Sequence, residues 1–137
     1  MNPVERVIGK WKQDGVELLP PNKEPDVIAV FTKLGLKVSQ DVVNLYCTIG
    51  GMEDFDSFMW SLWSLDRIDA ENRTYTKPYI LFADSMIDAY RYCFKYENAE
   101  NSSVYVDWLN GEEPELVANS MDEFFEYYFK SPEKILI

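Results

Sequence analysis

Residues 89–96 read AYRYCFKY, and aromatic side chains occupy every second position from Tyr90 to Tyr96. In an extended chain alternate side chains point to opposite faces, so one face of this segment is aromatic. Residues 97–101, ENAEN, have the polar composition of a turn, and residues 104–108, VYVDW, again favour an extended chain. The pattern therefore predicts two successive antiparallel strands joined by a short turn.

Further strands are predicted on both sides of this pair. Upstream lie residues 58–65, FMWSLWSL, whose apolar side chains on both faces indicate two-sided burial or a bulge, and residues 79–83, YILFA. Downstream, Asn110 and Gly111 form a dipeptide typical of hairpin turns, and residues 115–118, ELVA, suit a short last strand. We expect a meander of about four to six antiparallel strands.

Helical periodicity marks the chain before these strands. The apolar residues with helical spacing near the N-terminus are Val4, Val7, Ile8 and Trp11. Gly9 weakens a helix there, so an entry strand around Trp11 remains an alternative.

Two more helices are predicted between this segment and the first strand. One begins within residues 23–26, KEPD, and ends at Gly35. The next begins at Ser39 or Gln40 and ends at the glycine pair 50–51.

A last helix follows the strands. Ser120 and Glu123 have the spacing of a capping box, in which each side chain satisfies a backbone donor of the other. The apolar stripe behind them consists of Met121, Phe124, Phe125, Tyr128 and Phe129. The order of elements predicts an α+β fold in one domain, residues 1–137, with N-terminal helices, an antiparallel meander sheet and a C-terminal helix packed on the sheet.

Composition excludes several classes of function. The 137 residues carry a net charge of −11 and no histidine. The charge disfavours direct binding of nucleic acid or of an anionic membrane, and the missing histidine removes Ser/His/Asp triads, Cys/His dyads and most zinc sites. Cys47 and Cys93 lie in apolar stretches, as expected for buried free thiols in a reducing compartment. With no secretion signal and no apolar run of about 20 residues, we expect a soluble cytoplasmic protein.

The excess negative charge is confined to one part of the chain. Residues 1–51 hold six basic and six acidic side chains, whereas residues 52–137 hold seven basic and eighteen acidic ones. A one-sided field of this kind speeds encounter with a positively charged partner. The alternative is an acidic surface that only keeps the protein dissolved.

Catalytic motifs are missing from the sequence. It contains no GxGxxG, no phosphate-binding loop and no GxSxG elbow. Residues 53–56, EDFD, could bind calcium or magnesium through oxygen, but they lack the register of an EF-hand. A glycosidase would need two acids about 5–10 Å apart in a cleft, and nothing in the sequence indicates a cleft. We therefore expect no cofactor and no enzymatic activity.

Binding residues are predicted where acidic and aromatic side chains meet. Trp108 ends a strand beside the acidic turn 112–115, EEPE, and tryptophan is a favoured interface anchor. The candidates for contacting a basic protein partner are Glu53, Asp54, Asp56, Asp107, Trp108, Glu112, Glu113 and Glu115.

Four segments, taken in order, resemble a known family over residues 25–130. They are Leu34-Gly35-Leu36 before a helix that ends in Ile49-Gly50-Gly51, then WSLWSLDRI at residues 60–68, ILFADSMIDAY at residues 80–90 and LVANSMDEFF at residues 116–125. Their order and spacing are similar to those of the SUKH superfamily, which includes fungal regulators of cell-wall synthesis and many bacterial immunity proteins. The family commonly has Leu-Pro before the second helix, where this chain has residues 36–39, LKVS, and we expect Ser39 to cap that helix instead.

The resemblance implies a scaffold that binds proteins and carries no catalytic site. In bacteria such domains commonly neutralise a cognate toxin by direct contact, and an acidic surface suits a nuclease toxin because it competes with phosphate for lysine and arginine. A regulatory or scaffolding module without a toxin partner is the alternative, and an enzyme that uses carboxylates is a third possibility. The oligomeric state stays open.

Overall fold

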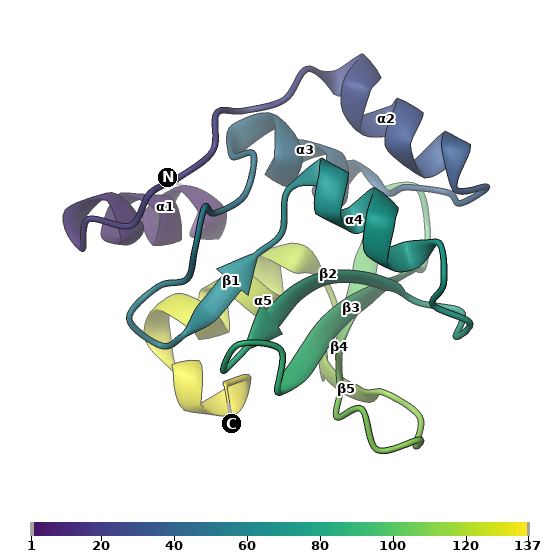
Figure 1. Ribbon diagram of the computed structural model, residues 1–137. Helices are drawn as coiled ribbons and strands as arrows, with labels where there is room; N and C mark the ends of the chain where they lie inside the picture. Colours follow the sequence, from purple (N-terminus) through teal and green to yellow (C-terminus); the bar gives the residue numbers. More distant parts are fainter. Residues whose placement is uncertain (1, 137) are drawn as a thin grey trace.

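The sheet predicted from the alternating segments is present in a computed structural model that describes residues 2–136 (Figure 1). It is a five-stranded antiparallel meander in the order β1-β2-β3-β4-β5. The strands are β1 (Trp60–Leu62), β2 (Ile80–Ser85), β3 (Tyr90–Tyr96), β4 (Ser102–Asp107) and β5 (Glu115–Ala118). The strands predicted at 79–83, 89–96, 104–108 and 115–118 are thereby confirmed, with ends that shift by a few residues.

Five α-helices and a short 3-10 helix complete the described chain. They are α1 (Pro3–Gln13), α2 (Glu24–Lys33), α3 (Gln40–Thr48), α4 (Leu65–Asn72), α5 (Met121–Lys130) and η1 (Pro132–Lys134). Among them, no helix is long and apolar enough to cross a membrane. Trp11 lies inside α1, so the alternative of an entry strand there is wrong.

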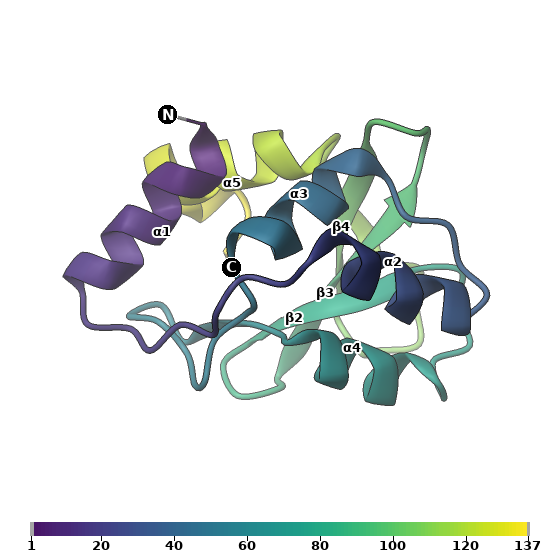
Figure 2. The same ribbon diagram turned by 90° about the horizontal axis from the view of Figure 1, so that it is seen from above.

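The helices gather on one face of the sheet (Figure 2). Phe124 of α5 contacts Phe82 of β2, and Phe31 of α2 contacts Phe94 of β3, with ring centroids 6.2 and 6.0 Å apart. Phe82 and Phe94 also contact each other, at 5.5 Å, so α2 and α5 share one sheet face. This arrangement confirms an α+β fold whose C-terminal helix packs on the sheet.

Trp60 is the centre of the aromatic core. It is fully buried, and its ring contacts aromatic rings from α1, the sheet and α5. Those neighbours are Trp11, Phe82, Tyr92, Phe124, Phe125 and Tyr128. The short strand β1 is thereby fixed between the N-terminal and C-terminal helices.

The strand predicted over residues 58–65 is shorter in the structure. β1 covers only Trp60–Leu62, and α4 begins at Leu65, where no helix was predicted. The side chain of Ser64 accepts a hydrogen bond from the Arg67 N–H and caps α4. The local cap therefore ends the extended segment, although the apolar run continues through it.

Two predicted caps also differ in detail. Ser39 precedes α3, but its side chain does not cap the helix. Its hydroxyl forms hydrogen bonds with the Asp41 carboxylate, which accepts, and with the Ser102 hydroxyl. Ser120 does accept from the Glu123 N–H, at 3.1 Å, whereas the Glu123 carboxylate accepts from the Asn119 N–H one residue earlier. Both sets of bonds still satisfy backbone or hydroxyl donors near a helix start.

Candidate protein-binding surface

Strand direction places three loops at one end of the sheet. In the antiparallel order β1, β3 and β5 run the same way, so their first residues lie at the same end. The loops found there are residues 53–59, which lead into β1, residues 86–89 between β2 and β3, and residues 108–114 between β4 and β5. We call these segments the loop end, and they lie in the lower half of Figure 1.

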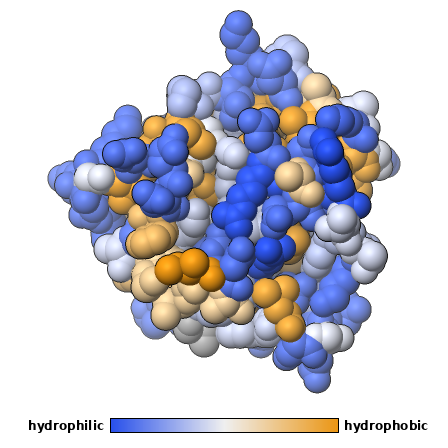
Figure 3. Space-filling model, viewed as in Figure 1, coloured by the Kyte–Doolittle hydropathy of each residue, from blue (hydrophilic) through white to orange (hydrophobic). Residues whose placement is uncertain are grey.

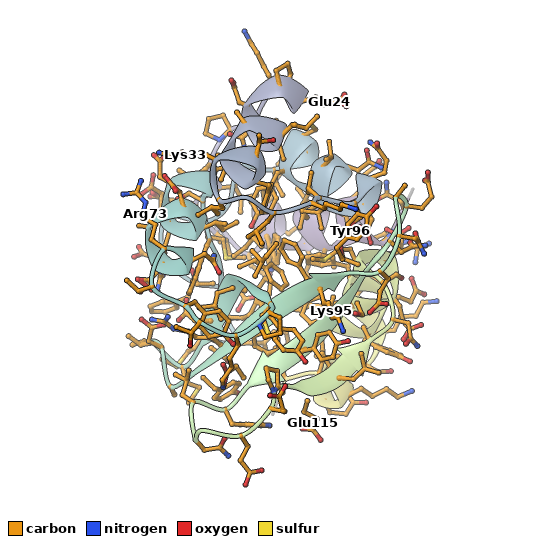
Figure 4. All side chains as sticks on the ribbon, turned by 90° about the vertical axis from the view of Figure 1, so that its right-hand side faces the viewer. Glu24, Lys33, Arg73, Lys95, Tyr96 and Glu115 are labelled. Carbon is orange, nitrogen blue, oxygen red and sulfur yellow. The ribbon has the colours of Figure 1, made fainter. Side chains whose placement is uncertain are left out.

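Five of the predicted binding residues are exposed acids in the loop end or directly after it. They are Glu53, Asp54, Glu112, Glu113 and Glu115. Within residues 2–136 none of them forms an ion pair, so their negative charge is not balanced by a bound cation side chain. In Figure 4, Glu115 projects from the lower end of the molecule, far from Lys33 and Arg73.

The five acids form two groups rather than one. Glu53 and Asp54 lie beside edge strand β1, and Glu112 to Glu115 lie beside the opposite edge strand β5. Strands β2, β3 and β4 separate the groups. The sequence could not show this separation, because it depends on the strand order.

Asp56 is not available to a partner, which corrects the prediction that it contacts one. Its carboxylate is buried and accepts from the Trp11 indole N–H at 3.0 Å and from the backbone N–H groups of Phe58 and Trp60 at 2.9 and 3.1 Å. Burial raises the pKa of Asp56, and these hydrogen bonds oppose that rise. Asp56 therefore fastens the loop 53–59 to helix α1.

Asp107 is also buried, and its predicted contact with a partner is corrected in the same way. It accepts from the Tyr75 hydroxyl at 2.6 Å, from the Leu109 N–H at 2.9 Å and from Lys77 Nζ at 3.3 Å. Lys77 also donates to the Glu112 carbonyl at 3.0 Å. Asp107 is thus the internal support of the loop that carries the exposed glutamates.

Trp108 is half-buried at the same end. Its ring packs against Tyr90 with centroids 5.1 Å apart, and its indole N–H donates to Glu115 at 3.2 Å. One side of the ring therefore supports the sheet, and only the remainder can meet a partner.

The loop end also exposes apolar side chains that were not among the binding residues predicted from the sequence. Among residues 2–136, nine large apolar side chains are exposed, and five of them lie in the three loops. These five are Phe55, Phe58, Met86, Ile87 and Leu109. Figure 3 shows apolar atoms gathered in the lower part of the face, where these loops lie, beside hydrophilic surface.

Left-handed backbone is concentrated in the same loops. Every non-glycine residue with positive φ in the described chain belongs to them: Met59, Met86, Ile87, Asp88 and Leu109. A left-handed L-residue costs roughly 1–2 kcal/mol, and a β-branched residue such as isoleucine is an outlier there. Such strain tends to cluster at functional sites, where the surrounding structure holds it.

Hydrogen bonds hold the turn 86–89 in this conformation. The Met86 N–H donates to the Met59 carbonyl at 2.9 Å, which joins two of the loops. The Asp88 N–H donates to the Asp84 carboxylate at 2.9 Å, and the Asp88 carboxylate pairs with Arg67 at 3.2 Å and Arg91 at 3.0 Å. The turn is therefore rigidly connected to β2, β3 and α4.

A hollow of about 420 Å³ lies between this turn and loop 53–59. Glu53, Asp54, Phe55 and Ile87 are part of its lining. At its wall the Arg67 guanidinium stacks on the Trp63 ring at 4.1 Å, and the Trp63 indole N–H donates to Asp84. Within residues 2–136 no three potential metal ligands of the His, Cys, Asp or Glu types come together.

A family comparison supports the resemblance. The model of the SMI1 / KNR4 family (SUKH-1) matches residues 21–127, which include all five strands, α2 to α4, most of α5 and the whole loop end. The comparison with curated proteins gave no match.

Proposed function

This chain belongs to the SMI1 / KNR4 family (SUKH-1), and we propose that it is a non-catalytic binding protein, an immunity protein that neutralises a basic toxin by direct contact. The toxin class we favour is a nuclease, because a nuclease must present lysine and arginine to phosphate. A surface of unpaired carboxylates competes with nucleic acid for those side chains.

One observation carries the proposal most directly. The exposed acids Glu53, Asp54, Glu112, Glu113 and Glu115 have no ion-pair partner within residues 2–136, although ten ion pairs form elsewhere in that part of the chain. Carboxylates that pair with no lysine or arginine among the described residues can pair with the lysines and arginines of a partner. Trp108 and the apolar loop residues add the uncharged contact area that a stable protein interface needs.

The N-terminal helix α1 lies outside the matched residues, yet we include it in the same domain. Trp11 of α1 contacts Trp60, Phe125 and Tyr128, with ring centroids 5.7–6.4 Å apart. We therefore propose one domain over residues 1–137.

The immunity role is tested with the protein encoded by the neighbouring gene. We expect co-expression of this chain to restore growth of cells that the neighbouring toxin domain inhibits, and the two purified proteins to form a complex. Binding without protection would favour the alternative of a regulatory module. If the two proteins do not bind and the cells are not protected, the proposed function is overturned.

Reversal of three exposed acids should slow association with that toxin domain. Within residues 2–136, none of the three side chains replaced in the triple variant Glu53→Lys, Asp54→Lys and Glu112→Lys makes an ion pair or a hydrogen bond that could be lost. We expect the association rate constant to fall by about tenfold or more at low salt and its dependence on salt to flatten, while dissociation changes less.

Stopped-flow kinetics between about 20 and 500 mM salt would measure this effect. The matched control reverses three exposed acids on α2 and on the β3–β4 turn: Glu24, Asp26 and Glu100. Equal slowing in both triple variants would show that only total charge matters and that the loop end has no special role.

A further inference from the structure

We propose that Ile87 is a preformed apolar anchor, which inserts into an apolar pocket bordered by lysine or arginine on the partner protein. This inference rests on the proposed function, because it names the contact through which the same partner is held. Ile87 is 68% exposed, the highest value among the large apolar side chains of residues 2–136. Contact between apolar surface and water is unfavourable. Transfer of the Ile87 side chain from solvent into an apolar pocket therefore lowers the free energy.

The backbone supports an anchor rather than an incidental exposed residue. Met86, Ile87 and Asp88 have φ values of 55, 55 and 65°, so three successive residues are left-handed without glycine. Glycine or asparagine would adopt this turn with less strain. Isoleucine adds backbone strain, which lowers the stability of the fold, but it supplies a branched apolar side chain at the tip of the turn. A residue that lowers stability in this way is expected where it serves binding.

The turn is also held in place before any partner arrives. Asp88 is paired with both Arg67 and Arg91, at 3.2 and 3.0 Å, and these arginines lie against the Trp63 ring at 4.1 and 5.3 Å. Little ordering entropy is therefore lost when the turn docks.

Charge complementarity selects the partner. Glu53 and Asp54 line the same hollow as Ile87, and both are exposed and unpaired within the described residues. Anionic membranes, nucleic acids and a second copy of this acidic chain would meet repulsion there. A protein surface with an apolar pocket and a basic rim is the occupant that fits both the isoleucine and the acids.

Ile87→Asn separates binding from stability. We expect the dissociation constant for the neighbouring toxin domain to rise about 10- to 100-fold, mostly through faster dissociation. At the same time the melting temperature should rise by about 2–6 °C, because asparagine accepts the left-handed conformation. Calorimetric titration and thermal unfolding measure the two effects on the same samples.

Two variants serve as controls. Ile28→Asn makes the same replacement at another exposed isoleucine, on α2 away from the loop end, and should leave binding unchanged without raising the melting temperature. Ile87→Leu keeps an apolar tip and should retain most of the affinity.

Each result has a distinct meaning. If Ile87→Asn binds the toxin domain as tightly as the unaltered protein, Ile87 is not the anchor, but the immunity function is unaffected. The same conclusion follows if Ile28→Asn loses as much affinity as Ile87→Asn. Failure of the unaltered protein to bind the toxin domain would overturn the proposed function and the anchor with it.

Discussion

Replacing Asp56 with alanine should lower the free energy of unfolding by about 3–5 kcal/mol, because three donors would lose their acceptor inside the protein. The Trp11 indole N–H and the N–H groups of Phe58 and Trp60 all point at this carboxylate. Asp56 is only 5% exposed, so water cannot replace it without entering the core. The effect should appear as a lower midpoint in urea unfolding with little change in slope.

Two comparisons isolate the cause of this loss. Asp54→Ala removes an exposed acid two positions away and should change stability by less than about 0.5 kcal/mol. Asp56→Asn keeps one oxygen, which can still accept from the two backbone donors, but it presents an amide to the Trp11 N–H. Its loss should therefore be intermediate. Similar midpoints for Asp54→Ala and Asp56→Ala would contradict the role given to Asp56.

The sheet was the most predictable part of the fold. The alternation in residues 89–96 and the hairpin dipeptide at residues 110–111 specify local geometry, and the structure contains the corresponding strands. Helix α4 could not be predicted in the same way. Only Leu65 and Ile68 are buried on its face, and the preceding aromatic run favours an extended chain. The cap at Ser64 was the available signal, and it is a weak one in isolation.

The candidate surface was predictable in composition but not in burial. Asp56 and Asp107 look like their exposed neighbours in sequence, yet each accepts the N–H of the residue two positions later. A short aspartate side chain within a loop or at its start can turn back onto that loop, whereas a glutamate extends more easily into solvent. An aspartate next to a predicted turn is therefore as consistent with a loop support as with a binding residue.

The left-handed turn at residues 86–87 was not predicted, because its two residues are not those that usually form such a turn. Met-Ile between two strands lacks the glycine or asparagine that a left-handed turn favours, so its composition did not indicate left-handed backbone, although residues 80–90 resemble the family's strand-turn-strand element. The strain becomes visible only as dihedral angles. What could have been noticed is the pair of large apolar residues at the point where two predicted strands must be joined.

Asp107→Ala is expected to lower the free energy of unfolding by about 3 kcal/mol and to loosen the loop that carries Glu112 and Glu113. The change removes the acceptor of the Tyr75 hydroxyl, the Leu109 N–H and the Lys77 ammonium in one step. Removing one partner of a buried ion pair is costly because the other charge stays behind. Lys77 is partly exposed, with 27% of its side chain accessible, so water recovers some of that cost. Urea unfolding measures the loss, and faster hydrogen exchange in residues 108–114 would report the loosened loop.

Acid unfolding tests the same contacts independently. Burial raises the pKa of Asp107, but the hydrogen bonds from Tyr75, the Leu109 N–H and Lys77 outweigh it, so the net pKa in the folded protein is lowered. The stability that Asp107 contributes is therefore complete above its unfolded pKa, about 3.9, and is lost as the pH falls through the lower folded value. Asp107→Asn cannot ionise, so its free energy of unfolding should fall less steeply than that of the unaltered protein below about pH 4. Parallel curves for the two proteins would mean that the carboxylate is not stabilised in its charged form, and the support assigned to it would have to come from packing alone.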